Sequence, residues 1–409
     1  MAQKDSHIVG LDMGSTKICA LVCRPVEGGK LRVVGFGVAE SKGWRKGVIV
    51  NLDLTVLALK KAVEAAESAA GVPIDSAYVG VGGSDVKGVN SRGGMNLGKP
   101  SATSREVGRE DVRKVIQTAQ GITLPQDRQI LHVLPQEFLL DSQDGIRDPL
   151  GMVGSRLEVD VHLVTASATA SQNVVTAANR AGIVVLDTVY EPLAAAEGCL
   201  TADERELGVA LVDIGGGSTG LIVFHQGTVR HTAVIPVGGE HFTNDIAVGL
   251  RTPIPEAEKM KKIWGERDLN TPGDTLLEVP SVGERPSRVV SYSMVSEITE
   301  PRAVELLELI QAELVRSGCD KQLGAGVVLA GGGAKLGGLP ALAEQVLGLP
   351  LRTAMPRGLD SLGETLADPA YTTVAGLVSY GNRLRLMRDS RDATGWLGKL
   401  WKSFIGKGD

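Results

Sequence analysis

One pattern occurs twice in this sequence, as IVGLDMGSTKICALV at residues 8–22 and as VALVDIGGGSTGLIV at residues 209–223. Each copy is an apolar run, an Asp, a Gly-rich turn with hydroxyl residues, and a second apolar run. Two apolar runs joined by a short turn of this kind are typical of a β-hairpin. Because the unit recurs far along the chain, the sequence predicts two related α/β lobes that face each other.

The segments around the hairpins fit this plan. A third Gly-rich turn, VVLAGGGAKLGGLP at residues 327–340, follows a buried-strand pattern and leads into a helix-like segment. Strands are predicted for residues 78–83 and 159–167. Ala- and Leu-rich stretches without breakers, or stretches entered through an acid and a Pro, predict helices at residues 53–70, 171–182, 191–198 and 368–381.

Two further segments stand apart. Residues 84–158 are rich in strands and turns except for a helix predicted at residues 109–120, so they are expected to be an insertion in the first lobe. An amphipathic helix is predicted at residues 296–314, entered through Glu300 and Pro301.

Composition excludes several classes of protein. The chain has 409 residues, 43% hydrophobic and 22% charged, which is typical of a folded globular protein of two or three domains. The net charge of −5 argues against a general nucleic-acid binder. The start, MAQKDSHIVGLD, does not resemble a signal peptide, and the four Cys form no CxxC pair, so free thiols inside the cell are expected.

The two hairpin turns have a chemistry in common. Gly-rich turns expose backbone N–H groups that can bind phosphate oxygens. Asp12 and Asp213, one in each turn, would repel phosphate directly but could hold Mg²⁺ through its water shell. Two such turns that face each other would grip the β- and γ-phosphates from both sides, with Lys17 as a point charge.

At this point the sequence resembles a known superfamily. Five segments match, in order, the nucleotide-site segments of the actin/Hsp70/sugar-kinase superfamily: DMGSTK (12–17), EPLAAAEG (191–198), VDIGGGST (212–219), LAGGGAKLGGL (329–339) and DPAYTTVAGLVSYG (368–381). Within it the chain is most similar to the FtsA family of bacterial cell-division proteins. Four further segments carry that likeness: HVLPQEF (132–138), GIRDPLGMVGSRLEVDVHLVT (145–165), NDIAVGLRTP (244–253) and AEKMK (257–261).

The resemblance implies a fold and its subdivision. It implies a two-lobed, actin-like (ribonuclease H-like) α/β fold with an inserted subdomain of the 1C type and a C-terminal amphipathic helix. The implied divisions are 1–83 with 164–206 and 372–388 (1A), 84–163 (1C), 207–240 with 325–371 (2A), 241–324 (2B), 389–395 (linker) and 396–409 (tail).

The resemblance also implies ATP and Mg²⁺ as cofactors. Asp12 and Asp213 would lie near Mg²⁺, and Glu191 has the position that in hydrolysing relatives orients water or metal. As a helix N-terminal acid, Glu191 could equally be favoured by the helix dipole alone. The implied nucleotide contacts are Gly14, Ser15, Thr16, Lys17, Gly215, Gly216, Gly217, Ser218, Thr219, Gly238, Gly239, Glu258, Lys261, Gly331, Gly332, Gly333 and Ala334.

The C-terminal tail has the pattern of a membrane-surface helix. Its apolar residues fall within about half of a helical wheel, with two lysines on the other side. From Gly381 to the end the chain has four Arg and three Lys but three Asp, so this end is positively charged and anionic lipid should attract it. The alternative is a helix docked on the body or on another subunit. The residues concerned are Trp396, Leu397, Leu400, Trp401, Phe404 and Ile405, with Lys399 and Lys402.

Partners are implied by the family. Its second lobe receives the C-terminal tail of the tubulin-like division protein FtsZ, for which Arg302 and Glu305 are the positions of interest here. The family also implies actin-like protofilaments, contacts of residues 84–163 with other division proteins, no nucleic acid, and a place on the cytoplasmic side of the membrane at the division site.

Two other functions stay open on the sequence. A sugar kinase or polyphosphate hydrolase could use the same fold, although it needs an acid or base at an acceptor site. A pilus-assembly scaffold could carry the same insertion and would not need the tail. Whether ATP is hydrolysed, and then at most slowly, is also open.

Overall fold

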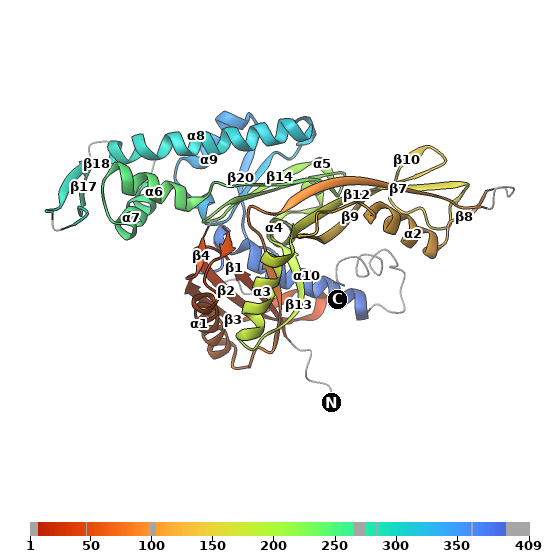
Figure 1. Ribbon diagram of the computed structural model, residues 1–409, viewed down its shortest axis with the longest axis horizontal. Coiled ribbons are helices and arrows are strands. Elements are labelled where there is room, and N and C mark those ends of the chain that lie inside the picture. The colour runs from red at the N-terminus through yellow and green to blue at the C-terminus, as the bar shows by residue number, and fades with distance from the viewer. Residues whose placement is uncertain are drawn as a thin grey trace.

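The first lobe is built on a six-stranded sheet that begins with the first hairpin (Figure 1). The computed structural model describes residues 7–45, 47–98, 104–265, 275–283, 285–360 and 363–389. β1 and β2 pair antiparallel with Asp12 opposite Cys19, as the sequence predicts. In spatial order the strands are β13 (Val184–Tyr190), β6 (Ser76–Val81), β1 (Ile8–Met13), β2 (Lys17–Pro25), β3 (Leu31–Glu40) and β21 (Leu359–Asp360).

Three of the helices that cover this sheet lie within three residues of the predicted bounds, whereas the helix predicted at residues 368–381 begins at Thr372 and continues to Asp389. α1 ends at Gly71, whose left-handed backbone suits a helix C-terminus. α4 and α10 approach so closely that a Cβ on Gly376 would lie 1.6 Å from the Ala194 carbonyl oxygen. These helices are α1 (Leu52–Ala70), α3 (Ala168–Arg180), α4 (Glu191–Cys199) and α10 (Thr372–Asp389), the last preceded by the 3₁₀ turn η4 (Pro369–Tyr371).

The second lobe repeats the plan with a five-stranded sheet around the second hairpin. β14 and β15 pair antiparallel with Asp213 opposite Gly220, again as predicted. The strands are β16 (Thr228–Ile235), β15 (Thr219–His225), β14 (Val209–Ile214), β19 (Val327–Ala330) and β20 (Leu351–Thr353). The third Gly-rich turn follows β19, contains the 3₁₀ turn η3 (Gly332–Lys335), and leads into α9 (Leu339–Leu347).

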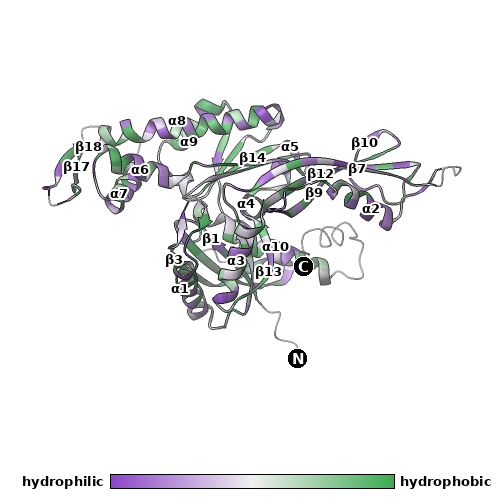
Figure 2. Cartoon of the chain, viewed as in Figure 1, coloured by the Kyte–Doolittle hydropathy of each residue, from purple (hydrophilic) through white to green (hydrophobic). Residues whose placement is uncertain are grey.

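The rest of the second lobe is mainly helical. It comprises α5 (Ala202–Leu207), α6 (Gly239–Gly249), α7 (Ile254–Gly265), α8 (Tyr292–Ser317), η2 (Asp320–Gln322) and the hairpin of β17 (Leu276–Val279) and β18 (Arg288–Ser291). Figure 1 shows α6, α7 and this hairpin at one end of the molecule, below the long α8. Figure 2 shows β1 in the hydrophobic colour, whereas α2 and α8 alternate between hydrophobic and hydrophilic, as helices with one buried face do.

The long helix corrects one prediction. α8 begins at Tyr292 rather than near Glu300, and Pro301 lies inside it. Ser291 caps its start, where the hydroxyl accepts a hydrogen bond from the Met294 N–H. Pro301 removes the N–H that would pair with the Glu297 carbonyl, but both residues are exposed, so water can bind that carbonyl. The expectation that Pro301 opens the helix is therefore wrong.

Residues 87–167 contribute a separate four-stranded sheet covered by one helix, and the strand predicted at residues 159–167 belongs to this sheet. It comprises β10 (Gln143–Ile146), β9 (Arg128–Leu140), β12 (Arg156–Ser167), β7 (Lys87–Asn96) and α2 (Arg109–Gln120). Short pieces complete the fold: β4 (Trp44–Arg45) with β5 (Val48–Ile49), β8 (Arg105–Glu106) with β11 (Val153–Gly154), and η1 (Glu27–Gly29). Although it is inserted in the first lobe, this sheet also bonds the second: His162 Nε2 lies 2.8 Å from Thr232 Oγ1, and the Gln136 amide donates to the Val229 carbonyl oxygen at 2.7 Å.

Candidate functional site

The two hairpin turns are closed in the same way. The Gly14 N–H donates to the Lys17 carbonyl oxygen at 3.0 Å, and the Gly215 N–H donates to the Ser218 carbonyl oxygen, also at 3.0 Å. Ser15 and Thr16 form the apex of the first turn; Gly216 and Gly217 form the apex of the second. The repeat seen in the sequence is therefore a repeat in backbone geometry.

The two apices meet between the lobes. A Cβ built on Gly216 would lie 2.4 Å from the Thr16 methyl carbon, so a larger residue there would push the turns apart. Gly47 lies beside the same point, since a Cβ on this glycine would lie 3.6 Å from the Ser218 hydroxyl oxygen. The structure thus brings Thr16, Gly216 and Ser218 together at one place between the lobes.

Three carboxylates lie close enough behind these turns to influence one another's pKa. Asp12 and Asp213 come from the two hairpins, and Glu191 is the first residue of α4. Gly82, at the end of β6, makes room for the third acid, because a Cβ on Gly82 would lie 2.0 Å from Glu191 Oε2. Neither the hairpin pattern nor the resemblance pointed to Gly82; a glycine directly after a buried strand was the available signal.

The electrostatics of the three acids are unfavourable without a cation. Burial raises the pKa of Asp12 to about 6; Lys17 opposes this rise and Asp213 adds to it. Burial, then the charges of Asp12 and Asp213, raise the pKa of Glu191 well above its ordinary value. Burial also raises the pKa of Asp213, against the effects of Lys17 and of a hydrogen bond from Thr373. A divalent cation would neutralise this repulsion, so the acids fit a metal-dependent site.

These acids do not by themselves form a metal cage. In the part of the chain that the structure describes, no three His, Cys, Asp or Glu side chains are grouped closely enough to hold a metal ion.

Lys17 lies between the hairpins and the start of α10. Its ammonium donates to the Ala370 carbonyl oxygen at 2.6 Å and lies 4.9 Å from the centre of the Tyr371 ring. Thr373 Oγ1 donates to Asp213 Oδ2 at 3.2 Å, and the Gly331 N–H donates to the Pro369 carbonyl oxygen at 3.1 Å. The segment of η4 and early α10, which the resemblance places among the nucleotide-site segments, therefore contacts both hairpins; the individual bonds were not indicated by the sequence.

The start of α6 packs against the second turn. The Gly239 and Glu240 N–H groups donate to the Gly215 and Gly216 carbonyl oxygens at 2.9 and 2.8 Å. A Cβ on Gly238 would lie 2.6 Å from the Gly216 carbonyl oxygen, so a glycine is needed for this approach.

A polar group from α7 lies behind these glycines. Lys261 Nζ lies 2.6 Å from Glu258 Oε2 and donates to Thr243 Oγ1 at 3.0 Å and to the Gly239 carbonyl oxygen at 3.2 Å. The pair expected on one face of a helix is thus formed, and it contacts the loop of Gly238 and Gly239. Thr243, which completes the group, was not singled out in the sequence.

The third turn and Thr219 contribute packing as well as open space. Gly331 adopts φ +79°, and a Cβ there would lie 2.4 Å from Asp213 Oδ1; a Cβ on Gly333 would lie 2.2 Å from the Ile214 side chain. Ala334 is buried. Gly332 has open space around it. Thr219 is buried and donates to the Val237 carbonyl oxygen at 2.7 Å, so its hydroxyl is already engaged.

Arg302 and Glu305 lie on α8, far along the chain from both hairpins. Arg302 bonds Asp245 at 2.6 Å and also pairs with Glu305. Beside them is a groove of about 450 Å³ lined by Glu297, Glu300, Pro301, Val304, Glu305 and Glu308. Four of its six lining residues are acidic.

The expected membrane tail, residues 396–409, lies outside the described residues. Within the described ranges, no helix has both the length and the apolar content that a bilayer crossing requires. The four cysteines are free and buried, as the sequence predicts.

Comparison with solved structures establishes the fold. The chain aligns over 92% of its length with 98% of a chain of the PilM–PilN type IV pilus biogenesis complex, at a TM-score of 0.65 and 19% identity. It aligns over 95% of its length with 99% of MreB5 of Spiroplasma citri bound to ADP, at a TM-score of 0.57 and 15% identity. The fold is thus the two-lobed actin-like fold with an inserted subdomain.

Comparison of sequences identifies the family. The family model "Cell division protein FtsA" matches residues 210–376, and the model "SHS2 domain inserted in FTSA" matches residues 83–165. The cell division protein FtsA of Pseudomonas aeruginosa is 44% identical, with 93% of this chain and 90% of the relative covered. The Escherichia coli FtsA is 36% identical over 93% of this chain and 91% of the relative. This chain therefore belongs to the FtsA family of actin-like cell division proteins.

Proposed function

We propose that this protein binds Mg²⁺–ATP between its lobes, polymerises on the inner face of the cytoplasmic membrane at the division site, and links the FtsZ ring to that membrane. The observation that carries the proposal is the pair of identically closed hairpin turns that bring Asp12 and Asp213 to one cleft. Two structures of one relative by fold, MreB5 of Spiroplasma citri with ADP and with AMPPNP bound, lend support to a nucleotide between the lobes.

Each cleft residue has a proposed role. The apex N–H groups and hydroxyls of the turns, at residues 15–16 and 216–218, would bind phosphate oxygens, while Gly14, Gly215 and Thr219 would hold the turns in shape and Lys17 would add a positive charge. Mg²⁺ would neutralise the acids and the phosphates together. Gly238 and Gly239 would approach the sugar–phosphate side, Glu258 and Lys261 the ribose and base, and residues 331–334 the adenine, where Gly332 leaves space.

Hydrolysis is proposed to be slow at most. Glu191 is the candidate for orienting water, since it shares the cleft with both aspartates. Burial and the charges of both aspartates raise the pKa of Glu191, so the protonated form, which cannot accept a proton from water, is more populated than in an exposed glutamate. A chain of this kind uses ATP mainly to hold its lobes in one arrangement for assembly.

The tail supplies the proposed membrane attachment. Removing residues 396–409 should lower co-sedimentation with anionic vesicles by at least about tenfold, because the apolar face and its lysines are then lost. ATP binding, measured by calorimetry on the same sample, should stay within about twofold. Vesicles of neutral lipid serve as the control for the electrostatic part. Undiminished sedimentation of the shortened chain would contradict the proposal.

The groove on α8 is the proposed site for the C-terminal tail of FtsZ. Its glutamates would attract a basic segment of the peptide. Arg302, which pairs with both Asp245 and Glu305, would hold the Glu305 carboxylate in place at the groove. Other division proteins are proposed to contact residues 84–163.

A single neutral substitution tests this groove. Glu305→Gln should weaken binding of a synthetic FtsZ tail peptide by about tenfold and reduce its salt dependence, since one carboxylate of the groove is removed. Fluorescence anisotropy measures both effects. Glu64→Gln, on the exposed face of α1 in the first lobe, is the matched control and should bind as the wild type does. If the two variants bind the peptide with equal affinity, the peptide binds another surface of the protein.

A further inference from the structure

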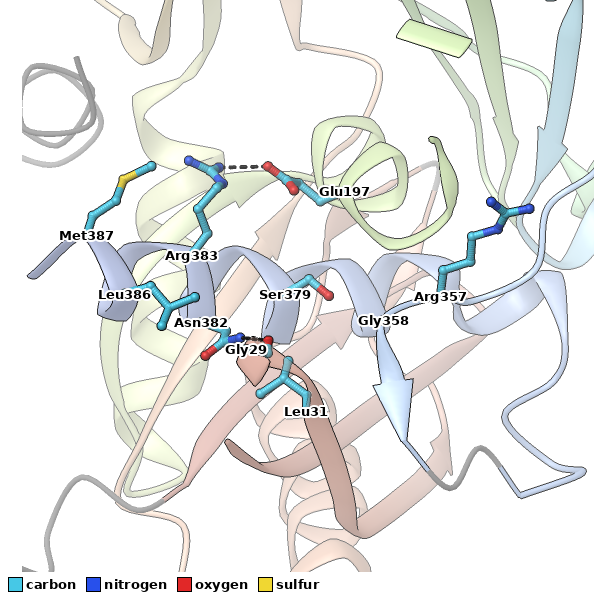
Figure 3. Close-up of a pocket in the computed structure, with 10 residues that line it drawn as sticks. All are labelled: Gly29, Leu31, Glu197, Arg357, Gly358, Ser379, Asn382, Arg383, Leu386 and Met387. Carbon is cyan, nitrogen blue, oxygen red and sulfur yellow. Dashed lines mark hydrogen bonds and ion pairs between the residues drawn. The ribbon is translucent and has the colours of Figure 1, made fainter. Parts of the chain in front are cut away.

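A second groove lies along α10 in the first lobe, away from the proposed nucleotide site. α10 forms its floor with residues 379, 382, 383, 386 and 387, which lie on one face of the helix (Figure 3). The turn of η1 and β3 forms one wall and the end of α4 forms the other. Residues 357–358 join the two walls, because the Arg357 N–H donates to the Gly198 carbonyl oxygen and the Gly358 carbonyl oxygen accepts from the Leu31 N–H. The groove measures about 710 Å³, enough for several large side chains.

The groove contains a buried hydrogen-bond acceptor that no described residue pairs. Glu197 and Arg383 neutralise each other across 2.8 Å. The Asn382 amide donates to the Gly29 carbonyl oxygen at 2.9 Å, which fixes its orientation, as Figure 3 shows. Asn382 is only 6% exposed, yet its Oδ1 has no hydrogen-bond partner among the described residues. A buried acceptor of this kind is costly unless something donates to it.

The floor is apolar where α10 approaches its end. Leu386 is 43% exposed, and Met387 lies next to it. A helix face with exposed apolar residues between two walls is the arrangement that accepts an amphipathic helix. An occupant should therefore offer large apolar side chains and one N–H donor.

The chain itself carries such a segment. Twenty residues follow α10, and the first six of them, residues 390–395, can span about 20 Å when extended. Asn382 lies seven residues before Asp389, about 10 Å along the helix, so the tail can return to it. The tail holds Trp396, Trp401, Leu400 and Phe404, and an indole N–H is a donor that seeks an acceptor when buried.

We propose that the tail of this chain, residues 396–409, docks its apolar face in this groove when it is not on a membrane, with an indole N–H donating to Asn382 Oδ1. The tether makes the local concentration of the tail high, so modest contacts suffice. The apolar face that docks is the same face that is proposed to enter lipid, so the docked tail and the membrane-bound tail exclude each other. Here the inference rests on the proposed membrane role. The body of the protein thus competes with the bilayer for its own anchor.

Disulfide trapping in the full-length chain, without lipid, tests the docking. The native cysteines are buried, which keeps the background low. Ser379→Cys with Leu400→Cys should oxidise to an intramolecular disulfide at least about fivefold faster than Arg385→Cys with Leu400→Cys. Position 385 is nearer to the tail along α10 but is not a groove residue, so a free tail would reach it more readily. Equal or reversed rates would overturn the proposal, and only intermolecular disulfides would assign the groove to a second copy instead.

Vesicle binding gives an independent readout. Leu386→Gln should tighten binding to anionic vesicles about three- to tenfold, because a tail released from the groove is more available to lipid. Leu309→Gln on α8, where the leucine is 40% exposed, is a matched control that should not change binding. Asn382→Leu, checked for folding by its melting curve, should act as Leu386→Gln does. If no variant tightens, cis competition is overturned; if the wild type binds no vesicles, the membrane proposal fails while the disulfide rates still decide the docking.

Discussion

Asp213→Asn is expected to lower the affinity for Mg²⁺–ATP by at least about 100-fold. Asp213 stands one residue before the end of β14, beside the second turn, and Thr373 fixes its carboxylate by a bond of 3.2 Å. Asn keeps the shape but removes the charge that would hold the water shell of Mg²⁺. The metal would then be lost from between the acids and the phosphates, so phosphate would meet the remaining carboxylates without neutralisation.

Isothermal titration with ATP, in Mg²⁺ and in EDTA, measures this effect. The difference between the two conditions should be large for the wild type and nearly absent for Asp213→Asn. Asp203→Asn, an exposed acid in the first turn of α5, is the control and should bind as the wild type does. Unchanged affinity in Asp213→Asn would remove the basis for a nucleotide cleft between the hairpins.

The acid cluster should also make the metal-free protein less stable as the pH rises. The pKa of Asp12 is about 6 in the folded chain and about 4 when unfolded, so folding takes up a proton between these values. The corresponding stability is present below about pH 4 and is lost as the pH rises through 6. Asp12→Asn removes this penalty. It should therefore raise the free energy of unfolding by about 3 kcal/mol at pH 7.5 and by roughly half as much at pH 5.

Urea denaturation in EDTA at the two pH values measures this difference. Adding Mg²⁺ and ATP should reverse the order of stability, since only the wild type gains from binding. A stability gain that is the same at both pH values would mean that Asp12 is ionised with an ordinary pKa, and that the cluster is not under electrostatic strain.

Local pattern was sufficient for the elements of the site but not for their mutual contacts. The hairpins follow from apolar runs around Gly-containing turns, and α2 from its amphipathic period, because those signals act between near neighbours. The α8 start was misjudged because Pro301 is tolerated on an exposed face, and exposure depends on packing. Gly82 beside Glu191 and the bond from Lys17 to Ala370 join residues that are more than a hundred positions apart.

The sequence by itself determined two lobes, each with an acid-bearing hairpin, and the family to which the chain belongs. It did so because a strand period, a glycine turn and a repeated motif are properties of contiguous residues. Tertiary structure alone decided that three acids come close together and that the segment of η4 and early α10 contacts both hairpins. It also decided that α10 forms the floor of an open groove, in which no described residue pairs with the buried acceptor of Asn382. Burial and charge at these places come from segments that meet only when the chain has folded, and the pKa of an acid depends on those neighbours.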